Sequence, residues 1–168
     1  MPTLDPTRDA AGETRIPSHL RGKFLNDASL RRFTLDLTDG AASERARDDR
    51  SIESPRVADD RIGLRDSFGY AVSTSGNAIV RHDLDTDGSV TQDSGGSRIP
   101  GEPVVVPRPG ARHEDDGCLS TYVSDEPTNS SEFVVLGGGD IAGDPVARVP
   151  LPQRVPFGFR GSWIPAAE

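Results

Sequence analysis

The feature that most constrains the fold of this chain is a repeat of short strand-like segments. "TLDLTDG" (34–40) and "RHDLDTDG" (81–88) share an Asp-Leu pair followed by a glycine turn, and the two pairs lie 47 residues apart. Val135-Leu136 follows 52 residues later in a comparable segment. Spacings of roughly 40–50 residues, built from short strands and glycine turns, are typical of β-propeller blades. About two and a half such periods cannot close a ring, and an open arc leaves apolar sheet faces uncovered at both ends, so the repeat predicts missing blades.

Short β-like segments between turns and prolines, of which 32–37 alternates apolar and polar residues, predict strands beyond residue 28, and no apolar stripe with helical spacing is longer than a turn. The segments expected to be strands are 32–37, 77–84, 103–106, 118–124 and 132–136. Residues 1–28 are polar and punctuated by prolines, which predicts a flexible arm before a folded part that spans 29–168. The fold class expected is therefore all-β, with antiparallel strands, short hairpins and part of a propeller.

Composition and charge exclude several classes of function. The net charge is −8 and the pI about 4.9, so the surface repels nucleic acid and anionic lipid. No apolar run approaches the ~20 residues that a membrane span needs. The first residues hold no hydrophobic signal core, which favours a cytoplasmic location. The single cysteine, Cys118, excludes an internal disulfide framework.

Several short motifs can be interpreted either as functional sites or as ordinary structural elements. Residues 83–88 resemble the start of a calcium loop, but the twelfth position is Ser94 instead of glutamate and the flanks read as strands, so a hairpin turn is favoured. The run 113–116 collects acidic residues beside a histidine and is expected to be a solvated loop. No two of His19, His82 and His113 have a spacing typical of metal ligands, and no serine lies in a nucleophile elbow.

Three segments carry more information: "IESPR" (52–56), "GEPVVVPRPGA" with "EDDG" (101–117), and the closing "RVPFGFRGSW" (154–163). Glu53 and Glu102 each stand close to a proline at a strand edge, which suits either a rigidly held carboxylate or a surface turn. Arg160 stands among glycines and aromatic residues, which usually line a dry, closely packed place. A permanent cation is unusual there.

In this order, these segments and "FGYA" (68–71) resemble the C-terminal part of the carotenoid cleavage oxygenases, a family that includes the lignostilbene dioxygenases and the retinoid isomerohydrolases. The resemblance runs from about residue 29 to 165. It implies a seven-bladed propeller with Fe(II) on its axis, held by four histidines. The implied reaction uses O2 to cleave a conjugated alkene of a carotenoid, apocarotenoid or stilbene into two carbonyl products.

The resemblance also implies roles for particular residues. By motif position, Glu53 and Glu102 look like two glutamates that hydrogen-bond the ligand histidines and fix their orientation. The last histidine ligand of the family is replaced here by Arg160. A guanidinium has no acceptor lone pair and stays protonated, so it cannot ligate iron, although Glu53 or Glu102 could pair with it. The other three ligand histidines would precede residue 1.

Three hypotheses follow for the chain as a whole. The first is the last third of an Fe(II)-dependent dioxygenase, whose partners are an apolar polyene or stilbene, O2 and the upstream part of the propeller. The second is a non-catalytic remnant or a partial propeller that docks on another chain. The third is a small acidic β-sheet binding module unrelated to oxygenases.

Overall fold

A computed structural model describes residues 28–156 and 161–165 of the chain. The predicted arm (1–28) lies outside the described residues except for residue 28, and so does Arg160. The described elements are β-strands and one short 3-10 helix, η1 (Asp59–Arg61). The strands are β1 (Arg31–Leu35), β2 (Ala42–Ala46), β3 (Ile52–Arg56), β4 (Phe68–Ser73), β5 (Ala78–Asp83), β6 (Ser89–Asp93), β7 (Arg98–Pro100), β8 (Val104–Pro107), β9 (Gly117–Asp125), β10 (Ser130–Gly137) and β11 (Ala147–Pro150).

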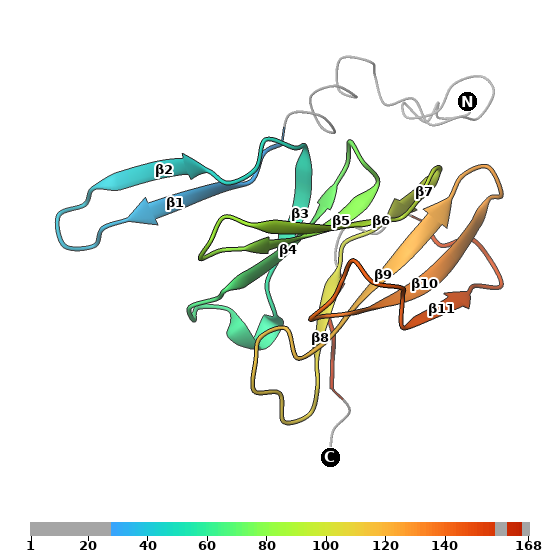
Figure 1. Ribbon diagram of the computed structural model, residues 1–168. Helices are drawn as coiled ribbons and strands as arrows, with labels where there is room; N and C mark the ends of the chain where they lie inside the picture. The colour runs from blue at the N-terminus through green and yellow to red at the C-terminus, as the bar shows by residue number, and fades with distance from the viewer. Residues whose placement is uncertain (1–27, 157–160, 166–168) are drawn as a thin grey trace, which may run out of the picture.

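The strands form three antiparallel sheets in chain order (Figure 1). β1 and β2 make a two-stranded ribbon that extends away from the rest of the chain. β3 to β6 make a four-stranded meander, and β7 to β11 a five-stranded sheet in which β7 and β8 both pair with β9. Each strand expected from the sequence is present within a few residues, which confirms the all-β class and the partial propeller.

The hairpin turns after β1 and β5 share one geometry, as the repeat predicts. The backbone N–H of Asp36 donates to the carbonyl of Ala41 (2.8 Å), and that of Asp83 donates to the carbonyl of Gly88 (2.8 Å). In both turns the side-chain oxygen of the aspartate accepts backbone N–H groups two or three residues on. These hydrogen bonds lower the pKa of both carboxyl groups. The fourth residue after each aspartate, Gly40 or Asp87, has a positive φ (76° and 64°). The segment 83–88 is therefore a hairpin turn, as expected.

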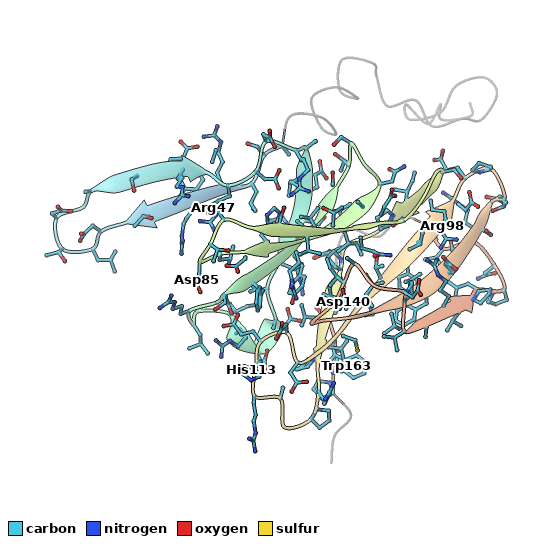
Figure 2. All side chains as sticks on the ribbon, in the orientation of Figure 1. Arg47, Asp85, Arg98, His113, Asp140 and Trp163 are labelled. Atoms are coloured by element: carbon cyan, nitrogen blue, oxygen red, sulfur yellow. The ribbon has the colours of Figure 1, made fainter. Side chains whose placement is uncertain are left out.

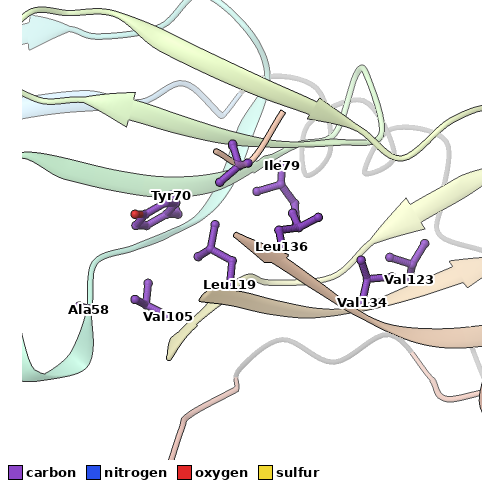
Figure 3. Packing of buried hydrophobic residues seen from close by; sticks show 9 residues of the cluster. Ala58, Tyr70, Ile79, Val105, Leu119, Val123, Val134 and Leu136 are labelled. Carbon is purple, nitrogen blue, oxygen red and sulfur yellow. The ribbon is translucent and has the colours of Figure 1, made fainter. Parts of the chain in front are cut away.

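The main core lies between the four-stranded and five-stranded sheets (Figure 3). Its buried members are Ala58, Tyr70, Ile79, Val105, Leu119, Val123, Val134, Leu136 and Ile141. Alternation along β5, β9 and β10 brings these side chains onto facing surfaces. Arg81 also joins the two sheets: its guanidinium donates to the carbonyl of Gly138 (2.8 Å) and lies 4.8 Å from the centre of the Phe68 ring. Two adjacent blades therefore form one packed unit.

Apolar side chains are uncovered at both ends of the arc. On the ribbon, the side chains of Phe33 and Leu35 are 66% and 67% exposed. On the far face of the five-stranded sheet, Tyr122, Phe133 and Val149 form a row across β9, β10 and β11, in which Tyr122 and Val149 are about half exposed. The predicted exposure at both ends is thus confirmed. Within the described ranges, no helix has the length and apolar character needed to cross a membrane.

A buried polar cluster fastens the segment between ribbon and four-stranded sheet to β5. His82 on β5 and Asp48 are both buried, with 3.6 Å between Nδ1 of His82 and Oδ2 of Asp48. Arg50 donates to both carboxylate oxygens of Asp48. Arg47, at the junction between the sheets in Figure 2, forms an ion pair with Asp87. The cluster fixes the path of the chain from one blade to the next.

The stability of the chain is expected to fall as the pH drops from 7.5 to 5.5, because of His82. Burial lowers the pKa of His82 below its ordinary value of 6.5, and Arg50 and Arg47 lower it further although Asp48 opposes them. At pH values below ~6.5, His82 therefore binds more protons in the unfolded chain than in the folded chain. Its contribution to the free energy of unfolding is complete above that pH and is lost as the pH falls toward the pKa of His82 in the folded chain. Urea unfolding across this range measures it. The change in the free energy of unfolding with pH should become smaller in His82→Gln. It should persist in His113→Gln, which replaces an exposed histidine. An equal pH dependence in the two variants would contradict the assignment of the effect to His82.

Candidate functional site

Glu53 and Arg56 lie on β3 at an irregularity in its pairing with β4. Glu53 is opposite Val72, but regular pairing resumes only at Arg56, which is opposite Tyr70. Ser54 between them has a φ of 52°, a region that non-glycine residues seldom adopt. Extra residues in one strand bend it and redirect its side chains, as often occurs beside functional sites. The "IESPR" motif therefore encodes a β-bulge next to Glu53.

Glu102 is held in a rigid connection between β7 and β8. The N–H of Gly101 donates to the carbonyl of Tyr122 (2.8 Å), and the hydroxyl of Thr121 donates to the carbonyl of Gly101 (2.8 Å). Pro103 on the other side is fully buried. With both neighbours fixed, the backbone of Glu102 has little freedom. This agrees with a rigidly held carboxylate and excludes a surface turn, because the Glu102 side chain is only 7% exposed.

Arg56 links the two glutamate-bearing motifs. Its Nη1 donates to Oε1 of Glu102 (2.9 Å) and its Nη2 to Oδ1 of Asp59 (2.6 Å) in η1. The other carboxylate oxygen of Glu102, Oε2, is buried and has no hydrogen-bond partner among the described residues. A buried carboxylate oxygen without a donor is costly, so a donor from outside the described residues is expected to satisfy it. An imidazole N–H is a suitable donor, and a ligand histidine oriented in this way is common around metals.

The acidic loop 113–116 is not simply solvated, contrary to the sequence-based expectation. Glu114 is mostly buried, and its Oε2 accepts the N–H groups of Ser67 (2.6 Å) and Phe68 (3.2 Å) at the start of β4. Its Oε1 accepts from Nη2 of Arg61 (3.0 Å). The "EDDG" motif therefore joins the β8–β9 loop to the neighbouring blade. His113, in contrast, is exposed on this loop (Figure 2).

The closing motif returns to the strand that follows Glu102. A Cβ on Gly161 would lie 2.8 Å from Cγ2 of Val104, so only glycine allows this approach. Upstream, the N–H of Val155 donates to Oγ of Ser131 on β10 (3.1 Å). The two described parts of "RVPFGFRGSW" are thus anchored on β10 and against β8.

Two residues of these motifs were given no role from the sequence alone. Arg56 was visible only as the last letter of "IESPR", and its pairing with Glu102 spans 46 residues of sequence. Tyr70, in "FGYA", is buried, and burial raises the pKa of its hydroxyl to about 12. The Tyr70 hydroxyl is therefore protonated at neutral pH and has no hydrogen-bond partner among the described residues. In the described ranges, no three histidine, cysteine or acidic side chains are grouped so that they could hold a metal ion.

Comparisons with known proteins agree with this arrangement. The family model described as retinal pigment epithelial membrane protein matches residues 3–165. The carotenoid cleavage oxygenase of Mycobacterium tuberculosis is 34% identical over 148 residues, which cover 82% of this chain and 29% of that protein. The apocarotenoid-15,15'-oxygenase of Synechocystis is 30% identical, with 83% of this chain and 30% of that protein covered.

Solved structures show the same fold. Cobalt-substituted apocarotenoid oxygenase from Synechocystis superposes with a TM-score of 0.78 at 28% identity, covering 82% of this chain and 30% of the solved one. This chain thus spans about 30% of the length of the relatives it matches. The family match extends further toward the N-terminus than the sequence motifs do. The chain belongs to the carotenoid cleavage oxygenase family.

Proposed function

We propose that this chain forms the C-terminal blades of an Fe(II)-dependent dioxygenase that cleaves a conjugated C=C bond with O2. The substrate class is a carotenoid, apocarotenoid or stilbene, and the products are two carbonyl compounds. The names of the relatives support carotenoids and apocarotenoids as the substrate class. Because the chain spans about 30% of those relatives, the activity belongs to an assembly larger than the described residues. A cytoplasmic location remains a prediction from the sequence.

The observation that carries this proposal is the half-paired carboxylate of Glu102. Arg56 holds one oxygen at 2.9 Å and so restricts the carboxylate, while the other oxygen is buried and has no hydrogen-bond partner among the described residues. A carboxylate fixed on one side and open on the other suits a group that orients a ligand histidine.

The described residues suit a supporting role toward iron and do not ligate it. Glu102, and by motif position Glu53, would accept N–H groups of ligand histidines and fix their tautomers. A neutral imidazole oriented in this way presents its other nitrogen to the metal. Fe(II), when bound, supplies the site at which O2 reacts with the alkene. The histidines themselves come from outside the described residues.

Arg160 supports a second candidate function, a non-catalytic remnant or docking fragment. In this reading the blades keep their packing and their carboxylates, but the replaced ligand prevents iron binding. Glu53 or Glu102 would then pair with the Arg160 guanidinium, which would offer Oε2 of Glu102 a donor that the described residues do not provide. The two candidates differ in one measurable property, the iron content of an assembled propeller.

Glu102→Gln is expected to lower metal affinity and alkene cleavage by ~10–100-fold, as the loss of such supporting groups typically does. The test uses a hybrid in which this chain replaces the matching part of the Mycobacterium tuberculosis relative and carries Arg160→His. Iron content and O2-dependent cleavage of an apocarotenoid are measured. Glu126→Gln, at an exposed position, is the matched control. If Glu102→Gln binds iron and turns over like the control, Glu102 has no supporting role.

A further inference from the structure

A small cavity of about 10 Å³ lies between the four-stranded and five-stranded sheets. This is about the room that one water-sized particle needs. Two arginines, Arg98 on β7 and Arg148 on β11, supply the charged groups of its lining. The other lining residues include several members of the main core and are Ile79, Gln92, Ser94, Thr121, Val123, Val134 and Leu136. An apolar interface therefore holds two guanidinium groups beside one small cavity.

The two arginines share one carboxylate. Glu132 on β10 accepts a hydrogen bond from Nη1 of Arg148 (2.8 Å) and forms an ion pair with Arg98, which is labelled in Figure 2. Asp125 stands opposite Arg98 on β9, but it accepts the hydroxyl of Ser97 (2.7 Å) and does not line the cavity. The cavity is thus bordered by two positive charges, and the one negative charge beside it is shared between them.

Arg98 has a donor that the described residues do not satisfy. Its Nε is buried and has no hydrogen-bond partner among them. Burial lowers the pKa of Arg98, and the positive charge of Arg148 lowers it further although Asp125 opposes this effect. A buried N–H of a charged group is costly without an acceptor. An anion in the cavity would accept this N–H and offset the repulsion between the two arginines.

We propose that the cavity binds one small monovalent anion of the size of chloride, and that this anion links the two sheets. A cavity of this volume is too small for phosphate, sulfate or a carboxylic acid. Gln92 on β6 and Ser94 just after it add an amide and a hydroxyl from the four-stranded sheet, whereas both arginines belong to the five-stranded sheet. Only the folded chain brings these groups together, so the anion stabilises the fold. This site does not depend on the proposed function.

Urea unfolding of the full 168-residue chain tests the proposal in sodium chloride and in sodium gluconate of equal ionic strength, because gluconate is too large for the cavity. At a chloride concentration ten times the dissociation constant, the equilibrium constant for unfolding should be about 11-fold lower in chloride. Arg148→Gln should remove this difference while Glu132 keeps its ion pair with Arg98. Arg112→Gln, at an exposed position, should retain it.

Line broadening of the chloride NMR resonance measures binding without unfolding. The unchanged chain and Arg112→Gln should broaden the resonance, and Arg148→Gln should not. Glu132→Gln should reach the same broadening at a lower chloride concentration, because it removes the negative charge that competes with the anion for both arginines.

Three results would overturn the proposal. One is an equal chloride dependence of unfolding in Arg148→Gln and Arg112→Gln. Another is the absence of chloride broadening beyond that of Arg148→Gln, since a water molecule would then be the occupant. The third is weaker chloride binding by folded Glu132→Gln than by the unchanged chain. If Glu132→Gln does not fold, the comparison of Arg148→Gln with Arg112→Gln still decides.

Discussion

Under the second candidate function, replacing Arg160 with histidine in the hybrid propeller is expected to raise iron from near zero to about one per chain. Cleavage of an apocarotenoid should rise by at least about 100-fold, since even supporting groups around metals contribute ~10–100-fold. A guanidinium has no lone pair to donate. At 4 Å it would repel each positive charge of the metal by about 4 kcal/mol at an effective dielectric constant of 20.

Elemental analysis and a cleavage assay under O2 measure this change, with Arg154→His as a matched control. Both arginines belong to the closing motif, but only Arg160 stands where the family resemblance implies the last histidine ligand. The isolated chain carrying Arg160→His should stay free of iron, because the resemblance implies three further histidine ligands and the described residues hold no group that could replace them. Full iron content and turnover in the hybrid that retains Arg160 would show that this position does not hold a ligand.

Truncation of Leu136 to alanine is expected to destabilise the chain by ~2–5 kcal/mol, as truncation of a fully buried leucine typically does. Leu136 is 2% exposed and lies in the core between the two larger sheets. A loss of this size is a large fraction of the ~5–15 kcal/mol that stabilises most domains. Because this core joins two blades, the loss of stability should also weaken the contact between them. Urea unfolding monitored by circular dichroism measures the change in free energy.

Leu64→Ala is the matched control, because it removes the same atoms from a side chain that is 61% exposed. Its effect should stay below about 0.5 kcal/mol, the usual range for surface substitutions. Similar losses in the two variants would mean that the interface between the blades contributes little to stability.

Local sequence signals were sufficient for the strands and hairpins. The segments 77–84 and 132–136 contain short apolar runs bounded by polar and turn residues, which indicates buried strands, and glycine or aspartate provides the positive φ of the turns. The repeat of Asp36 and Asp83 also predicted equivalent turns. These features depend on residues a few positions apart, so they can be read from one sequence.

Contacts between distant segments could not be read in this way. Arg56 and Glu102 are separated by 46 residues, and Glu114 caps the start of a strand in the neighbouring blade. An acidic run reads as a solvated loop unless the positions of its donors are known. The family resemblance pointed to Glu53 and Glu102 through their motifs. Only the structure shows that Arg56 pairs with Glu102 and that Oε2 of Glu102 has no hydrogen-bond partner among the described residues.

The uncovered apolar side chains at both ends of the arc have a consequence for the abundance of this chain in a cell. Chaperones and proteases recognise exposed apolar strands, and a chain that presents them is degraded or sequestered. The net charge of −8 slows self-association but hides neither end. Steady-state levels of these blades should therefore depend on how completely their apolar ends are covered, and copies with uncovered ends should have short half-lives.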